Sequence, residues 1–168
     1  MKQFAKKITL MFIFLYLATS IFAEEINLPS NKKLIITAPL GWDKKTFQSG
    51  DTRVAWRKPT PKDTGFLLIK TSEGGETDTE GYMRIVTHTY LMQKTEILSE
   101  PEKIMINGIE WYKINSKNEM EEGFSLKTET YCFVQDNVAI QIRIMAPSEY
   151  WTEVKEEVKN SLGSIIIK

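Results

Sequence analysis

The residue types that most often carry catalytic or metal-binding chemistry are scarce in this sequence. It contains a single histidine, His88, and a single cysteine, Cys132. Zinc sites usually need three or four nitrogen or sulfur ligands, and two side chains cannot supply them. His88 lies on a predicted helix beside Ile85 and Met92, at the edge of an apolar stripe. We therefore interpret it as a side chain at the boundary of the core without a chemical role.

Cys132 is also poorly placed for nucleophilic catalysis. A reactive thiol needs a neighbouring base and a position that favours the thiolate, such as a helix N-terminus. Cys132 lies instead in the middle of a predicted strand, between Tyr131 and Phe133, and we favour a buried structural thiol. The sequence also lacks the Gly-x-Ser-x-Gly elbow of many serine hydrolases.

Carboxylates are abundant, with 22 acidic residues in the chain. The acidic segments 73–80 and 118–123 lack the ligand spacing of an EF-hand loop, and we interpret both as solvated connections. The glycine doublet at 74–75 is not followed by Gly-Lys-Ser/Thr, so no phosphate-binding loop is indicated. A carboxylate pair of a hydrolase stays an open alternative, because the sequence singles out no pair. We predict no catalytic residue, no cofactor and no metal.

The first 23 residues have the layout of a secretory signal peptide. Three lysines precede an apolar run at 8–17, and a smaller, more polar end closes with Ala23. The apolar run is shorter than the roughly 20 residues that span a bilayer. We expect cleavage after Ala23, with a retained anchor as the alternative. The mature protein at 24–168 is then periplasmic or secreted.

The mature segment 24–168 has a length typical of one domain. Loss of three lysines with the signal peptide leaves 19 basic and 22 acidic residues in scattered positions. This is unlike the basic patch of a nucleic-acid-binding protein, and no later apolar run is long enough to span a membrane. A lone cysteine cannot form an intramolecular disulfide, so the apolar core must stabilise the fold.

Three runs rich in β-branched and apolar residues, at 33–38, 53–57 and 65–71, predict strands in the first half of this segment. The first run leads into Ala-Pro-Leu-Gly-Trp at 38–42, which suits a type I turn. Trp42 then either closes the end of the core as a wedge, which we favour, or stays exposed to grip a ligand.

Two amphipathic helices are predicted. The first occupies 77–94, where the stretch 77–80 is typical of a capping box and apolar residues recur at helical spacing over 82–92. The second begins with Ser148 as its N-cap and ends near Gly163. Its apolar stripe consists of Trp151, Val154, Val158 and Leu162.

Two hairpins are predicted between these helices. Asn-Gly at 107–108 joins strands 102–106 and 109–114, and its two-residue turn pairs Ile104 with Trp111.

The longer hairpin joins strands 124–135 and 138–146 around Asp-Asn at 136–137. Apolar residues alternate along the second strand with a period of two, which is typical of a β-strand. A two-residue turn places Cys132 opposite Gln141.

These elements predict an α+β domain. Hairpin connections make the sheet antiparallel, and two amphipathic helices need a sheet face to cover. We expect one twisted, mainly antiparallel sheet of six to seven strands packed against two or more helices, as an α/β/α sandwich.

Three segments resemble the PsbP/Mog1-like superfamily. They are Pro-Leu-Gly-Trp at 39–42, Ile-Asn-Gly at 106–108 with the aromatic pair at 111–112, and Asn-Ser-Leu-Gly-Ser-Ile at 160–165. The resemblance extends over most of the mature chain through short motifs. It implies an antiparallel sheet between helices and a role without catalysis, because members bind other proteins and help to assemble or regulate complexes.

Trp42, Tyr150 and Trp151 are the candidate residues of an interaction surface. Tyr150 and Trp151 are adjacent at a helix start and cannot both face the core, so we expect partial exposure of Tyr150. Our main hypothesis is an exported soluble module that binds an unidentified protein of the cell envelope, as a monomer or weak dimer. The alternatives are a small-ligand carrier with a pocket between helix 77–94 and the sheet, or a carboxylate-based hydrolase.

Overall fold

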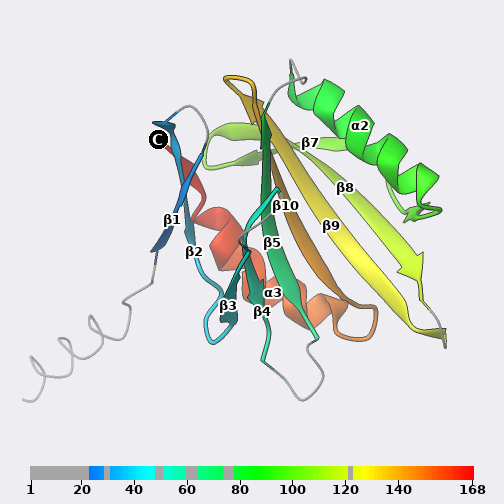
Figure 1. The fold of residues 1–168 in the computed structure, drawn as a ribbon. Helices are drawn as coiled ribbons and strands as arrows, with labels where there is room; N and C mark the ends of the chain where they lie inside the picture. The colour runs from blue at the N-terminus through cyan, green and yellow to red at the C-terminus, as the bar shows by residue number, and fades with distance from the viewer. Residues whose placement is uncertain (1–22, 29–30, 48–50, 60–63, 74–77, 121–122) are drawn as a thin grey trace, which may run out of the picture.

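The computed structural model describes residues 23–28, 31–47, 51–59, 64–73, 78–120 and 123–168 (Figure 1). Its strands form two antiparallel sheets. The larger sheet has eight strands: β3 (Asp43–Thr46), β4 (Thr52–Arg57), β5 (Phe66–Glu73), β6 (Glu96–Ile97), β7 (Glu102–Ile106), β8 (Ile109–Glu119), β9 (Ser125–Gln135) and β10 (Val138–Pro147). Their order is β3-β4-β5-β10-β9-β8-β6, and β7 pairs with β8 beside β6.

The smaller sheet has the order β1-β2-β11 and joins the beginning and the end of the described chain. Its strands are β1 (Ala23–Asn27), β2 (Lys33–Thr37) and β11 (Ile166–Ile167). β2 lies in the middle, antiparallel to both neighbours.

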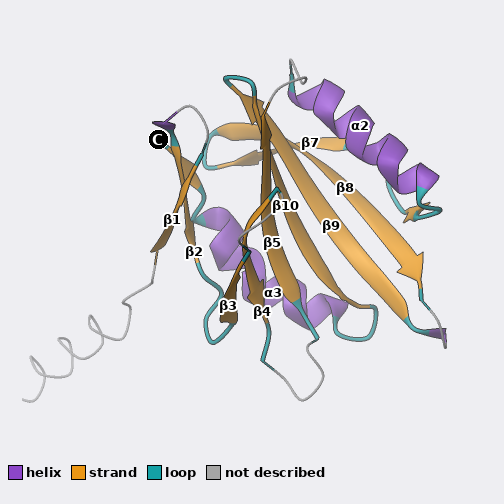
Figure 2. Ribbon diagram, viewed as in Figure 1, coloured by secondary structure: helices purple, strands orange, loops and turns teal. Residues whose placement is uncertain are grey.

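Two helices lie on opposite faces of the large sheet (Figure 2). Helix α2 (Thr79–Met92) packs on β8 and β9, whereas helix α3 (Trp151–Gly163) packs on β10 and on β2 of the small sheet. The predicted α+β fold with an antiparallel sheet between helices is confirmed. The large sheet has one more strand than the upper expected number, and a second sheet accompanies it.

The registers of both predicted hairpins are confirmed. Ile104 pairs with Trp111, and Cys132 pairs with Gln141. Asn107 and Gly108 both have positive φ, as a two-residue hairpin turn of this kind requires. The turn residues and the alternation of apolar side chains specify the same register, and this agreement explains the correct prediction.

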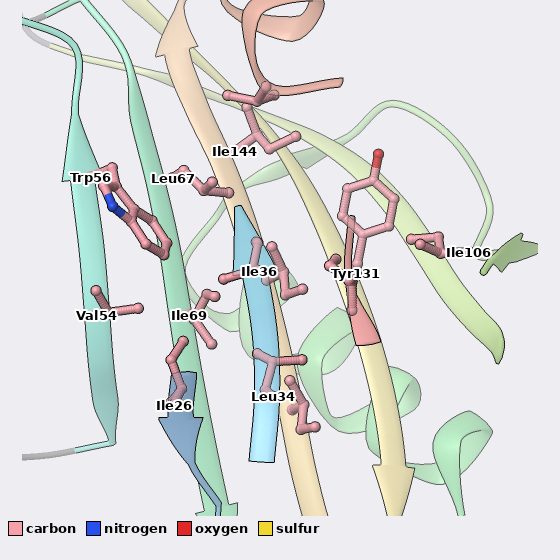
Figure 3. Packing of buried hydrophobic residues seen from close by; sticks show 14 of the residues in the cluster. Ile26, Leu34, Ile36, Val54, Trp56, Leu67, Ile69, Ile106, Tyr131 and Ile144 are labelled. Atoms are coloured by element: carbon pink, nitrogen blue, oxygen red, sulfur yellow. The ribbon is translucent and has the colours of Figure 1, made fainter. Parts of the chain in front are cut away.

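The main hydrophobic cluster fills the space between the large sheet, the small sheet and α3 (Figure 3). Leu34 and Ile36 of β2 are fully buried there, as are Val154 and Val158 of α3. A smaller cluster lies under α2 and contains Met83, Val86, Tyr90, Ile114 and Cys132. The stability of the fold therefore rests on two apolar layers separated by one sheet.

The strand predicted at 33–38 is present as β2, but it forms the middle of the small sheet and is not part of the large one. β1, β3 and β6 were not predicted. β3 consists of polar residues at a sheet edge and β6 has two residues, so neither shows an apolar period. β8 continues to Glu119, into a segment that was expected to be a connection.

The apolar stripe predicted for α2 was only partly correct: it included Val86, which is buried, and Tyr82, which packs against the smaller cluster, but also Ile85 and Met92. Met83, Val86 and Tyr90 are buried, whereas Ile85 and Met92 are 50% and 72% exposed. Apolar residues occur around most of this helix, and only contact with the sheet determines which of them face inward.

Both predicted helix caps also need correction. Asp78 is the N-cap of α2, and its carboxylate accepts a hydrogen bond from the Gly81 amide at 2.6 Å, while Thr77 is outside the described residues. Tyr150 is the N-cap of α3 and has no side-chain cap bond. The hydroxyl of Ser148 instead pairs with that of Ser125 at 2.6 Å.

Candidate functional site

The three aromatic residues that the sequence singled out occupy different positions. Trp42 is 8% exposed in the main core cluster, and its Nε1 donates to the Glu157 carboxylate at 2.9 Å. Tyr150 is half-buried and packs against the same cluster. Trp151 is also half-buried, but it lines a hollow on the surface beside α3. Trp42 therefore has the position of a core wedge.

Two surface hollows follow α3 along one flank. The first, of about 250 Å³, is lined by Leu98, Asn115, Ser116, Lys127, Thr128, Trp151 and Lys155. The second, of about 300 Å³, is lined by Ile104, Met105, Ile106, Asn107, Tyr131, Lys159, Leu162 and Gly163. We name these residues together the α3 trough.

Helix periodicity explains one wall of the trough. Trp151, Lys155 and Lys159 follow each other at intervals of four residues, so their side chains lie on one face of α3. The Lys155 ammonium lies 5.5 Å from the centre of the Trp151 ring, within the range of a cation–π contact. The wall thus alternates an aromatic ring with positive charge.

A buried carboxylate lies between the two hollows. Glu129 of β9 has a side chain that is only 3% exposed. The Tyr131 hydroxyl donates to one of its oxygens, and the Lys155 ammonium donates to the other at 2.9 Å. An unpaired buried charge is costly, and these two donors offset that cost. Burial, together with the neighbouring carboxylate, raises the pKa of the Tyr131 phenol.

The Glu129 carboxylate positions Lys155 and is not arranged to act as an acid or base. Both oxygens of Glu129 already accept hydrogen bonds, and its near-complete burial separates it from solvent. The pair therefore fixes the end of the Lys155 side chain at the boundary of the two hollows.

The first hollow carries unbalanced positive charge. Lys127 and Lys155 line it, and no acidic side chain does. Lys155 is paired with the buried Glu129, whereas Lys127 makes no ion pair with any residue that the structure describes. Leu98 and Trp151 lie beside these lysines. The hollow therefore combines apolar surface with Lys127, whose ammonium forms no ion pair with a described residue.

The other candidate side chains do not form a reactive site. Cys132 is fully buried under α2, and burial raises the pKa of its thiol to about 12. Its thiolate is therefore scarce at neutral pH. His88 is exposed on the outer side of α2, not at the boundary of the core as predicted. Within the described ranges, no three His, Cys, Asp or Glu side chains are arranged to hold a metal ion.

The space between α2 and the sheet, which we considered for a ligand pocket, is occupied by the smaller hydrophobic cluster. Both hollows of the α3 trough lie on the opposite face. Among the residues placed in the structure, no helix has the length and apolar character needed to cross a bilayer.

Sequence reasoning identified Trp151 but missed Lys127, Glu129 and Lys155. The sequence contained one indication that Glu129 is unusual. In the predicted register of the long hairpin, Glu129 lies on the same face as Tyr131 and therefore toward the core. A charged residue at an inward strand position is unusual, and it could have marked this part of the sheet. Lys155 is not part of the apolar stripe predicted for its helix, and its partner Glu129 is on another element, so the sequence alone did not single it out.

Comparison with known proteins identifies the fold. No protein-family model and no curated protein matches the sequence. Among solved structures, the solution structure of cyanobacterial PsbP (CyanoP) from Synechocystis sp. PCC 6803 is similar, with a TM-score of 0.56, 14% identity and coverage of 80% of this chain and 86% of that one.

Two further solved structures are similar to this chain. LpqN of Mycobacterium tuberculosis, described as involved in cell envelope biogenesis, has a TM-score of 0.61, 9% identity and coverage of 90% and 93%. PA94 of Pseudomonas aeruginosa, described as a putative regulator, has a TM-score of 0.54, 12% identity and coverage of 86% and 96%. The identities are low, but the likeness extends over most of each chain. Together with the antiparallel sheet between α2 and α3, it shows that this protein has a PsbP/Mog1-like fold.

Proposed function

We propose that this protein is an exported, non-catalytic accessory module of the cell envelope that binds a partner protein through the α3 trough. The observation that carries the proposal is the first hollow, where the half-buried Trp151 ring lies beside Lys127, a cation without an ion-pair partner among the described residues. Aromatic residues set in partly desolvated pockets supply much of the binding energy in protein interfaces.

The shape of the trough favours a polypeptide over a small ligand. Ligand pockets usually have volumes of about 300–1,000 Å³ in one enclosed space. Here two hollows of about 250 and 300 Å³ lie in line along α3. Each has room for one or two side chains of an extended segment, which would continue from one hollow to the next. A small-ligand carrier is the second candidate function.

The fold neighbours support an accessory role. LpqN is described as involved in cell envelope biogenesis and PA94 as a putative regulator. The buried, weakly acidic Cys132 thiol and the fully engaged Glu129 carboxylate are unsuited to a nucleophile or a general base.

Export is part of the proposal. Residues 1–22 are outside the described residues, and Ala23 is the first residue of β1. Cleavage after Ala23 would start the mature chain at Glu24, which pairs with Ile36 of β2. The small sheet would therefore keep nearly all of β1 after processing.

Site-specific photo-crosslinking in living cells tests this proposal. A photoreactive amino acid replaces Leu98, which is 46% exposed at the first hollow. The matched control replaces Ile85, which is 50% exposed on α2, on the opposite face of the sheet. We expect one protein partner to cross-link from position 98 and not from position 85, and Lys127→Glu to abolish this product. Cross-links of equal yield from both positions, or none from position 98, would contradict the proposal.

A further inference from the structure

The face of the large sheet that carries α2 is only partly covered. α2 packs on β9, β8 and β6, and no described helix lies over β5 and β10 on this side (Figure 1). The two strands are adjacent and antiparallel, with Lys70 opposite Gln141 and Leu68 opposite Arg143. Side chains directly opposite each other share a face, so Lys70 and Arg143 are diagonal neighbours, at the edge of the part that α2 covers.

Arg143 is held in place but leaves one donor unused. Its guanidinium lies 5.3 Å from the centre of the Tyr90 ring of α2, and the Tyr90 hydroxyl is in turn 2.6 Å from that of Thr130. Its Nε is buried and has no hydrogen-bond partner among the residues that the structure describes. Buried polar groups of folded proteins nearly always have partners, so an unpartnered guanidinium nitrogen indicates a missing acceptor.

Lys70 is a second cation next to Arg143. It makes no ion pair with any part of the chain that the structure describes. Burial and the neighbouring Arg143 lower the pKa of Lys70, and the charge of Asp51 offsets this only in part. Two cations placed together without an acid between them are unfavourable unless an anion joins them.

We propose that Lys70 and Arg143 form a binding site for the phosphate group of a ligand, on the face of the sheet opposite the α3 trough. The planar guanidinium presents parallel donors that match phosphate oxygens, and the ammonium adds a second charge. Gln141 lies opposite Lys70 but is only 3% exposed, so the two cations supply the accessible polar groups. Phe66, Leu68 and Met145 are half-buried on the same face and provide apolar surface next to the charges.

The phosphate could belong to a free anion or to a lipid headgroup, and the adjoining apolar residues make both sources reasonable. The test is an NMR titration of the uniformly labelled protein at constant ionic strength. One arm uses inorganic phosphate, and the other uses dihexanoyl phosphatidylglycerol below its micellar concentration. The Nε–H signal of Arg143 reports directly on the unpartnered donor.

We expect a saturable shift of this signal with phosphate and none with chloride. The Lys70→Gln and Arg143→Gln variants should bind phosphate at least about tenfold more weakly than wild type, as expected for the loss of one charge-assisted hydrogen bond. Roughly tenfold tighter binding of the lipid, with shifts at Leu68 and Met145, assigns the site to a headgroup, whereas equal binding assigns it to free phosphate.

Two results would overturn the proposal. The first is the absence of a saturable shift at Arg143 with both probes. The second is loss of binding in Lys127→Gln with normal binding in Lys70→Gln, which would place the phosphate in the α3 trough. Lys70→Gln should not lower the thermal midpoint in phosphate-free buffer, because it removes one of two repelling cations. It therefore keeps the proposal testable even if Arg143→Gln, which also loses the contact with the Tyr90 ring, is less stable.

Discussion

Gly65→Ala should destabilise the protein because Gly65 leaves space for the Trp42 wedge. A Cβ at position 65 would lie 2.9 Å from Cγ2 of Val154 and 3.0 Å from Cη2 of Trp42. Both neighbours belong to the core, at 0% and 8% exposure, and have little room to move. Overpacking of this kind costs about 1–3 kcal/mol.

A smaller opposing effect comes from the unfolded state. Replacing Gly by Ala reduces the conformational freedom of the unfolded chain, which stabilises by about 0.4–1 kcal/mol. The expected net loss for Gly65→Ala is thus about 1–2 kcal/mol. With a urea m-value of about 2 kcal/mol/M, the unfolding midpoint should fall by roughly 0.5–1 M.

Gly163→Ala is the matched control. Gly163 is the last residue of α3, and a Cβ there meets no atom within 4 Å. Its unfolding free energy should be unchanged or slightly higher. In a double-mutant cycle, Val154→Ala should reduce the cost of Gly65→Ala by making room for the new methyl group. Equal midpoints for wild type and Gly65→Ala, or strictly additive losses in the cycle, would refute the close packing of Trp42 over Gly65.

Three further predictions follow from contacts within the fold. Asn107→Ala removes a residue with positive φ and two hydrogen bonds that its side-chain amide donates, one to the carbonyl of Gly163 at the end of α3 and one to that of Ile165, and urea unfolding should show a loss of about 1–3 kcal/mol. Partial burial raises the pKa of Glu157, but hydrogen bonds from Lys58 and the Trp42 indole outweigh this and hold it below its ordinary value of 4.5. Its contribution is therefore present above pH 4.5 and lost as the pH falls through the folded pKa, so stability measured from pH 6 to 3 should fall less steeply in Glu157→Gln than in wild type. The buried Cys132 thiol, with its pKa near 12, should resist iodoacetamide at pH 8 in the native protein and react on unfolding in urea, and rapid native labelling would contradict its burial.

The parts of the fold that were predicted correctly are those whose signals are local. The turns at 107–108 and 136–137 and the alternation in β10 determine pairing between residues that are close in sequence. The small sheet could not be predicted, because β1, β2 and β11 bring together the two ends of the described chain. The buried face of α2 was only partly predicted, since Ile85 and Met92 are as apolar as the buried residues.

The α3 trough was only partly predictable for the same reason. Trp151 was identified as a candidate because it is adjacent to Tyr150 at the start of a predicted helix. Lys127, Glu129 and Lys155 come from β9 and α3, and only the packing of α3 across the sheet brings them together. The position of Lys70 next to Arg143 likewise depends on β5 lying beside β10, and these strands are far apart in sequence.

The affinity of the Trp151→Ala variant for the protein cross-linked from position 98 tests the central claim most directly. Calorimetry with the purified proteins would compare it with wild type and with Ile85→Ala on the opposite face. A hot-spot aromatic contributes about 2–4 kcal/mol, so Trp151→Ala should bind roughly 30-fold to 1,000-fold more weakly. Ile85→Ala should bind like wild type. Unchanged affinity of a folded Trp151→Ala variant would contradict a binding role for the α3 trough.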